Sequence, residues 1–300
     1  MVKLDRRTAL GVIALAASGA SLKTAAATDA QTAGNADPVG RFKRPRHDNP
    51  IPGGKLARGS RNIAAAWLSG PTQRYRHFAL GAEHEAETLV VATSDRRAFR
   101  LTLPPDSVFE DREPRIADVD GDGQDEVIVV RSYLKAGAAL AVAAVRNNEL
   151  TIIAETPPIG QPFRWLNPAG VGDFDGDGRP EVALVRMPHL AGELEMWAIR
   201  GGVLVKRYEA DDVSNHVIRS PHLRLSAVAD FNGDGVADLA IPSFDRRALR
   251  FLTAKGGRVR EIARVDLVGP AAEDFRVASR DGRPAVFVGL AGGRTTLVQP

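Results

Sequence analysis

A nine-residue acidic pattern that occurs three times constrains the fold of this chain more than any other feature. The copies are DVDGDGQDE (residues 118–126), DFDGDGRPE (173–181) and DFNGDGVAD (230–238), and their starts are 55 and 57 residues apart. Each copy has an oxygen-bearing side chain at its first, third, fifth and ninth positions and glycine at its fourth and sixth. Repetition at such a period indicates a fold assembled from copies of one supersecondary unit.

The spacing of the acids predicts a metal site in each copy. Carboxylates at alternate positions of a tight loop converge on one point, where their charges repel each other unless a cation lies between them. Several hard oxygen ligands favour calcium, because magnesium demands a near-ideal octahedron. We therefore predict about three calcium ions, each bound by the four side chains and by the backbone carbonyl of the seventh residue. The predicted ligands are Asp118, Asp120, Asp122, Gln124 (carbonyl) and Glu126; Asp173, Asp175, Asp177, Arg179 (carbonyl) and Glu181; and Asp230, Asn232, Asp234, Val236 (carbonyl) and Asp238. The glycines at the sixth position are expected to have positive φ.

Two other local structures compete with this interpretation. A single Asp-Gly pair is typical of a hairpin turn, but three copies of one nine-position pattern are not explained by turn chemistry alone. EF-hand and dockerin loops need an acid at the twelfth position leading into a helix, whereas here that position holds Val129, Leu184 and Ile241. These residues lie in the strand-like runs VIVV, VALV and LAI, so each loop is expected to join two β-strands.

The three segments resemble FG-GAP or VCBS repeats, the blades of β-propellers in integrin α-chain heads and in many exported bacterial proteins. The resemblance covers residues 118–126, 173–181 and 230–238 position by position. It implies an all-β propeller whose calcium loops join the first and second strands of each blade. It implies nothing about activity, because the same blade occurs in proteins of very different function.

Weaker copies suggest the number of blades. SDRRAFR (94–100) is similar to FDRRALR (244–250), which predicts a degenerate loop at residues 80–88. DGRPAV (281–286) is similar to DGRPEV (177–182), which predicts another at residues 277–285. The expectation is five blades of about four strands, within the usual range for propellers. The last repeat has room for three strands, so residues 62–68 (NIAAAWL) are expected to close the ring, with residues 74–80 starting a first blade that is shortened.

The chain is expected to divide into three parts. Residues 1–27 have the adjacent Arg6 and Arg7, a short apolar run and three alanines at 25–27, as in an export signal of the twin-arginine type. The general secretory route and an uncleaved N-terminal helix are the alternatives. Residues 28–61 are rich in Pro, Gly and basic side chains and are expected to form a flexible linker. Residues 62–300 would form the propeller, in the periplasm or secreted.

Composition excludes several classes of protein. The net charge of +3 resides in the first 27 residues, so the remainder gives no electrostatic support for binding nucleic acid. Hydrophobic residues at 44% and charged residues at 26% are ordinary for a soluble globular protein and argue against an integral membrane protein. With no cysteine, the chain has no thiolate zinc site and no cysteine nucleophile.

A ligand site is predicted on the rim opposite the acidic loops, where the resemblance implies that partners bind. Arginine and aromatic residues typical of binding hot spots occur there, and an anionic or sugar-like group is the expected ligand. The candidates are Arg131, Tyr133, Arg164, Trp165, His189, His216, Arg219 and His222. The alternative is that they are solvated loop residues and histidines with internal partners.

The sequence favours a calcium-stabilised propeller that acts outside the cytoplasm as a binding or scaffold module for a protein or carbohydrate. An exported enzyme acting on carbohydrate or phosphoester, with its site in the central channel, is the first alternative. Against it, no nucleophile motif, phosphate-binding glycine loop or HEXXH motif is present. A calcium sensor is the second alternative, which a closed ring does not favour. The ligand and the oligomeric state are left open.

Overall fold

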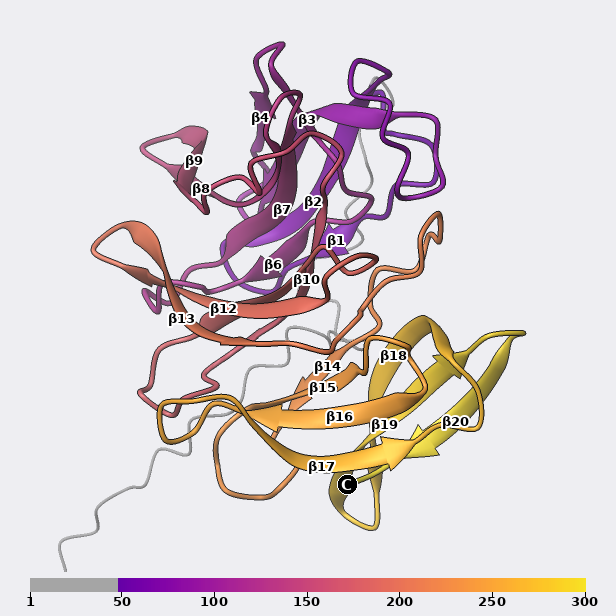
Figure 1. Ribbon diagram of the computed structural model, residues 1–300. Helices are drawn as coiled ribbons and strands as arrows, with labels where there is room; N and C mark the ends of the chain where they lie inside the picture. Colours follow the sequence, from indigo (N-terminus) through magenta and orange to yellow (C-terminus); the bar gives the residue numbers. More distant parts are fainter. Residues whose placement is uncertain (1–47) are drawn as a thin grey trace, which may run out of the picture.

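The computed structural model describes residues 48–300, which form twenty β-strands and no helix (Figure 1). The predicted export signal and residues 28–47 of the predicted linker lie outside the described residues. Within the described residues, no helix is long and apolar enough to cross a membrane. The prediction of an all-β fold is confirmed.

The first sheet has nine strands, and all of its pairs are antiparallel. Its order is β1-β2-β3-β5-β7-β8-β9, with β4 paired to β3 and β6 paired to β7. The bounds are Ala57–Arg58 (β1), Ile63–Thr72 (β2), Glu85–Thr93 (β3), Ala98–Thr102 (β4), Ser107–Phe109 (β5), Arg115–Ala117 (β6), Glu126–Tyr133 (β7), Gly137–Arg146 (β8) and Glu149–Glu155 (β9).

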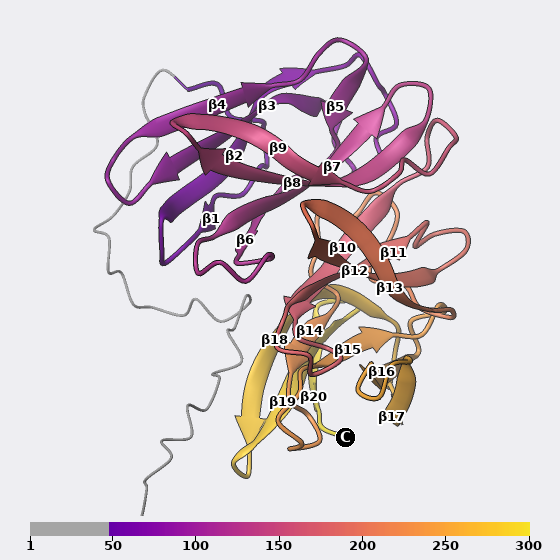
Figure 2. The same cartoon turned by 90° about the vertical axis from the view of Figure 1, so that its left-hand side faces the viewer.

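Three smaller antiparallel sheets follow in chain order, as Figures 1 and 2 show. The second sheet contains Leu166–Gly172 (β10), Glu181–Arg186 (β11), Glu193–Arg200 (β12) and Val203–Ala210 (β13). The third contains Ala227–Ala229 (β14), Asp238–Pro242 (β15), Ala248–Thr253 (β16) and Arg260–Asp266 (β17). The fourth contains Ala271–Arg280 (β18), Arg283–Leu290 (β19) and Arg294–Val298 (β20).

Several middle strands are apolar on both faces, as is typical of strands that are covered on both sides. β7, β8 and β11 are buried along most of their length, and the many alanines of β8 allow close approach of the adjoining layers. The outer strand β13 instead exposes most of its residues. β10 lies beside β14, and β14 lies beside β18, so the first strands of the last three sheets are neighbours.

Each acidic loop joins two antiparallel strands, as predicted: β6 to β7, β10 to β11, and β14 to β15. The register is the same in all three, because the residue before the loop pairs with the loop's ninth residue: Ala117 with Glu126, Gly172 with Glu181, and Ala229 with Asp238. The same nine-residue sequence pattern therefore closes the same hairpin three times.

The predicted closing strand is placed differently. Residues 63–68 belong to β2, which pairs with β1 and β3 and not with the last sheet. Among the described residues the sheets do not join into a closed ring of strand pairs.

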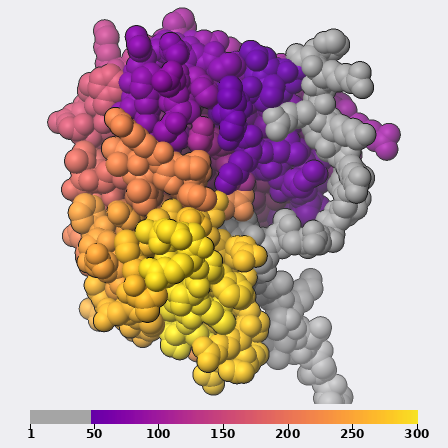
Figure 3. Space-filling model, turned by 90° about the vertical axis from the view of Figure 1, so that its right-hand side faces the viewer, coloured from indigo at the N-terminus to yellow at the C-terminus, as the bar shows by residue number. Residues whose placement is uncertain are grey.

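Residues 48–61, expected as linker, include β1, the buried Ile51 and a bridge between Pro50 and Ser69. The first and last sheets are both seen on the face drawn in Figure 3. The Lys55 amine, just before β1, is 3.0 Å from a carboxylate oxygen of Asp274 in β18.

Neither degenerate copy forms a nine-residue loop between first and second strands. Residues 80–84 belong to the β2–β3 connection and residues 85–88 to β3 itself, so residues 74–80 form no first strand. Residues 277–285 form a hairpin in which only Asp281 and Gly282 lie between β18 and β19. The two DRR segments occupy different connections, since one joins β3 to β4 and the other β15 to β16.

Candidate functional site

The backbone of each acidic loop is shaped by its own first side chain and its glycines. Asp118 accepts hydrogen bonds from the amides of Gly121 (2.7 Å) and Gly123 (3.0 Å), and Asp173 and Asp230 do the same in their loops. The sixth-position glycines have φ between 82° and 88°, which confirms the expected left-handed turn. The loop sequence therefore folds its acids towards one side through local contacts alone.

The carboxylates converge in the first two loops. Asp118, Asp120 and Asp122 offer oxygens that all lie within 4.8 Å of one another, and so do Asp173, Asp175 and Glu181. In the third loop an amide, Asn232, replaces one acid. The seventh residues, Gln124, Arg179 and Val236, donate their amides to the fifth-position acid at 2.7 to 3.0 Å, and the metal-binding role of their carbonyls stays a prediction.

The ninth residue of each loop is a buried carboxylate. One oxygen of Glu126, Glu181 and Asp238 accepts the amide of the loop's second residue at 3.0 to 3.1 Å. The other oxygen of Glu181 is buried and has no hydrogen bond among the described residues. Burial, together with the neighbouring acids, raises the pKa of Glu126 and Glu181 to about 7 and that of Asp238 to about 6. A hard cation would stabilise these ionised groups, so the donor set fits calcium, which would hold each loop to the strand that follows.

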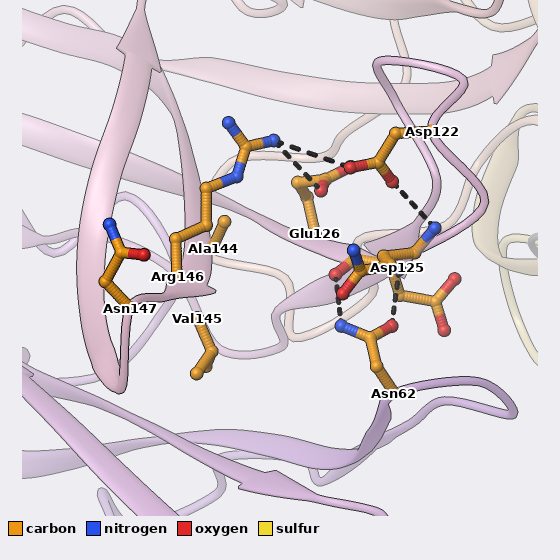
Figure 4. Close-up of a pocket in the computed structure, with 9 residues that line it drawn as sticks. Asn62, Asp122, Asp125, Glu126, Ala144, Val145, Arg146 and Asn147 are labelled. Carbon is orange, nitrogen blue, oxygen red and sulfur yellow. Dashed lines mark hydrogen bonds and ion pairs between the residues drawn. The ribbon is translucent and has the colours of Figure 1, made fainter.

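Basic side chains also face these acids, which the sequence analysis did not anticipate. Arg146 reaches the first loop, Arg200 the second and Lys255 the third. Figure 4 shows the Arg146 guanidinium directed at Asp122 and Glu126 in the first loop. The signal in the sequence was a basic residue at or just after the end of the third strand of each repeat.

On the opposite side, three of the eight predicted rim residues form one cluster. The Trp165 ring stacks on His189 (centroids 6.1 Å apart) and meets His216 edge-on (4.8 Å). The His216 Nε2 lies 3.0 Å from the carbonyl of Ser220, and this nitrogen must carry a proton to donate it. Neutral His216 then accepts from His189 Nε2 at 2.8 Å through Nδ1. Burial lowers the pKa of His189 to about 4 and that of His216 to about 3, so both are neutral at pH 7.

The other five rim residues lie apart from this cluster or have partners of their own. Arg131 and Tyr133 both bind Glu155, at 3.3 and 3.0 Å, and the guanidinium covers the tyrosine ring. His222 lies 3.5 Å from Asp274, beside the last sheet. The remaining two, Arg164 and Arg219, have no acidic partner among the described residues. The predicted rim set is therefore not one site.

A histidine–carboxylate pair adjoins the tryptophan cluster and was missed. His77 Nδ1 lies 2.6 Å from Glu110, which is buried and also accepts a hydrogen bond from Ser132 at 2.5 Å. Trp165 Nε1 donates to the backbone carbonyl of Glu110 at 2.9 Å and so joins the pair to the cluster. Tyr75 and Phe163 stack beside His77, and 47% of Phe163 is exposed. Because these residues come from distant parts of the chain, no local sequence pattern shows them.

A cavity of about 230 Å³ lies between β1, β6, β10 and residues 223–226. Its charged lining residues are Arg58, Glu113, Arg115 and Arg224. Arg224 forms an ion pair with Glu113, and Arg115 forms one with the buried Asp111. Arg58 has no ion pair among the described residues and is exposed.

Comparison with known proteins finds similarity in the region of the acidic loops. The FG-GAP-like repeat family model matches residues 114–184. Rhamnogalacturonan exolyase YesX of Bacillus subtilis (strain 168) is 24% identical over 179 residues, covering 55% of this chain and 28% of that protein. Rhamnogalacturonan endolyase YesW of the same organism is 30% identical over 98 residues, covering 30% of this chain and 16% of that protein.

The crystal structure of exotype rhamnogalacturonan lyase YesX aligns with a TM-score of 0.46 and 16% identity, over 84% of this chain and 50% of that one. In the two sequence alignments, this chain covers less than a third of the length of each curated relative. Residues 114–184, which match the FG-GAP-like repeat model, hold the first two acidic loops.

Proposed function

We propose that residues 48–300 form a five-bladed β-propeller. The nine-stranded sheet would supply two blades, β1–β4 and β6–β9, bridged by β5, and each later sheet would supply one. The neighbouring pairs β1 and β6, β10 and β14, and β14 and β18 support this order of inner strands. The contact of Lys55 with Asp274 brings the first and last blades together and would close the ring without a shared strand.

The proposed function is that of a calcium-stabilised binding module that acts outside the cytoplasm. The single observation that carries the calcium role is Oε1 of Glu181, which is buried, has no hydrogen bond among the described residues and faces a loop with three further acids, although Arg200 lies 3.7 Å away. Burying a carboxylate oxygen without a hydrogen bond is costly, and Asp238 in the third loop has such an oxygen too, so a cation bound at these loops would offset a cost that occurs twice. The ligand would be an anionic or sugar-like group held on this rim at the exposed Phe163, with His189 and the buried Trp165 behind it.

Two measurements test this function. Bound calcium is counted in purified protein after dialysis, and thermal unfolding is followed with calcium and with chelator. About three ions and a higher melting temperature in calcium are expected, whereas no bound ion and no shift would refute the calcium role. A change of overall shape with calcium, seen by small-angle scattering, would favour a sensor instead.

The ligand site is tested by glycan binding. Phe163→Ala is suitable because 47% of the residue is exposed, so the fold should survive the change. Val268→Ala is a matched control, since Val268 is 79% exposed in the β17–β18 connection. Loss of binding to an acidic oligosaccharide in the first variant alone supports the site. Equal binding by both variants contradicts it.

An enzyme acting on carbohydrate is the second candidate, favoured by the names of the two curated relatives. The cavity between β1, β6 and β10 would then hold the reacting group, with Arg58 as a free cation beside it. The test is incubation with rhamnogalacturonan while ultraviolet absorbance of newly formed double bonds is followed. Activity that falls in Arg58→Ala supports this candidate, and no activity with the intact chain refutes it for this substrate.

A further inference from the structure

The three acidic loops share a feature beyond their own nine residues: a cation supplied by the turn after the third strand of the same repeat. Arg146 is the last residue of β8, Arg200 is the last residue of β12, and Lys255 follows β16 by two residues. Antiparallel strands alternate in direction, so this turn lies at the same end of the sheet as the acidic loop. The geometry is therefore repeated, and each cation reaches the loop of its own repeat.

In the first loop the cation lies among three of the acids. Arg146 Nη2 is 2.6 Å from Asp120 Oδ2 and 3.9 Å from both Asp122 Oδ2 and Glu126 Oε1. Figure 4 shows this guanidinium pointing into the cavity that the loop borders. Asp120, Asp122 and Glu126 are also predicted calcium ligands. The guanidinium and a calcium ion therefore draw on the same oxygens.

The second and third loops repeat the arrangement with fewer contacts. Arg200 Nη2 is 2.8 Å from Asp177 Oδ2 and 3.7 Å from Glu181 Oε1. Lys255 Nζ is 3.2 Å from Asp234 Oδ2 and 3.1 Å from the carbonyl oxygen of the same residue. The number of acidic side chains that the cation reaches thus decreases from the first loop to the third.

Strands β1 to β4 provide an internal comparison. The turn after β3 carries Arg97, but the connection between β1 and β2 (residues 59–62) has no acid. Arg97 instead binds Asp95 (2.7 Å) within its own turn and Asn148 in the neighbouring turn. A basic residue in this turn reaches towards the first connection only where that connection is acidic.

We propose that Arg146, Arg200 and Lys255 are tethered cations that compete with calcium and lower the calcium affinity of their loops. This inference rests on the proposed calcium role. A side chain attached to the same sheet acts at a high effective concentration, so it competes even against millimolar free calcium. Calcium binding would displace the side chain to solvent. The loops would also remain compact before calcium arrives, because their acids already have a positive partner.

The experiment is calcium titration of the full chain against a chromophoric chelator, with Arg146→Met, Arg200→Met and Lys255→Met compared with wild type. Methionine keeps an unbranched side chain and removes the charge. Loss of one exposed ion pair corresponds to about a three- to tenfold gain in affinity at that loop. The gain is expected to be largest for Arg146→Met and smallest for Lys255→Met. Arg97→Met is the matched control and should leave all calcium constants unchanged.

A second measurement keeps the test independent of affinity. In chelator, Arg146→Met should melt below Arg97→Met, because Asp120, Asp122 and Glu126 lose their cation while Arg61 still pairs with Asp118. In calcium the difference should shrink. If Arg146→Met does not fold, Arg146→Gln, which keeps hydrogen-bond donors without the charge, replaces it in both measurements.

The outcomes separate this inference from the function it rests on. No calcium binding by the wild-type chain would refute the calcium role itself. Normal wild-type binding with unchanged affinity in all three variants would overturn the competition. Weaker binding in the variants would also overturn it, since the cations would then support the calcium-bound loop.

Discussion

Replacing Glu181 by glutamine tests the calcium role most sharply, because the change is isosteric and acts at a buried position. Glu181 is fully buried, one oxygen accepts the Phe174 amide at 3.1 Å, and the other has no hydrogen bond among the described residues. A glutamine oxygen can still accept from Phe174. Asp175→Ala is a poorer test, since Asp175 also accepts a hydrogen bond from Tyr208 at 2.6 Å that would be lost with or without metal.

The magnitude follows from two opposing effects. Burial raises the Glu181 pKa from 4.5 to about 7. At pH 8 the ionised Glu181 carboxylate therefore destabilises the folded state by about 3 kcal/mol. This destabilisation is fully present above pH 7 and disappears as the pH falls towards 4.5. In chelator, Glu181→Gln should therefore be more stable than wild type by up to about 3 kcal/mol.

Calcium changes the comparison. With a dissociation constant of about 10⁻⁴ M and about 1 mM calcium, each site stabilises the fold by about 1.4 kcal/mol, so three sites contribute about 4 kcal/mol. Glu181→Gln should reduce this calcium increment to about 3 kcal/mol, a loss of about 2–4 °C in the melting-temperature shift. The increment, and not the absolute stability, is the measure of ligation.

The assay is chemical and thermal unfolding at pH 8, in calcium and in chelator. Glu209→Gln is the matched control, because its side chain is 70% exposed on β13 and its ion pair is with Lys206 and not with a residue of an acidic loop. An unchanged calcium increment in Glu181→Gln would refute the reasoning. So would an equal loss of stability in both conditions.

Two further predictions concern the opposite side of the molecule. His189 and His216 have pKa values lowered to about 4 and about 3, so the unfolded chain binds their protons first as pH falls below 6.5. By pH 5, each of the two histidines should therefore lower the free energy of unfolding of the protein by about 2 kcal/mol. Denaturation of His189→Gln at several pH values should show a smaller loss of stability than denaturation of wild type. Gly81→Ala should cost more than about 2 kcal/mol, because its Cβ would lie 2.2 Å from the Arg219 carbonyl oxygen at φ 70°. Gly201→Ala, with φ 61° and open space, should cost about 1 kcal/mol, and equal melting temperatures would contradict the steric argument.

The acidic loops could be predicted from sequence because their determinants are local. Asp118 accepts from Gly121 and Gly123, all within six residues, and glycine supplies the positive φ that the turn requires. The same local pattern also fixes the strand register, since the loop's ninth residue pairs with the residue before the loop. No distant contact is needed to form this hairpin.

The DRR similarity misled the assignment of the first blade because it encodes a turn and not a position in the repeat. Asp95 and Asp245 each accept a hydrogen bond from a hydroxyl two residues earlier, at 2.5 and 2.6 Å. The following arginines, Arg96 and Arg246, have φ of 70° and 60°. Identical turn chemistry therefore appears in the third connection of one group and the second connection of another.

The prediction of a degenerate loop at residues 277–285 was wrong for a related reason. Asp281 and Gly282, with φ of 52° and 76°, suffice for a two-residue hairpin between β18 and β19. An Asp-Gly pair without further acids gives that shorter turn. The contacts within the rim clusters could not be predicted from local sequence patterns, because they join residues far apart in the chain. Trp165 and Glu110 are 55 residues apart, and His189 and His216 are 27 residues apart.

The contact between Lys55 and Asp274 has a consequence for how the chain folds. It joins residues 219 positions apart, whereas most strand pairs in the later sheets join neighbours in sequence. The hairpins can form as the chain emerges, since their loop-closure cost is small. The first and last sheets can meet only after residue 274 has been synthesised, so this docking is a late step with high contact order. A truncation before β18 should therefore leave folded hairpins whose assembly is arrested.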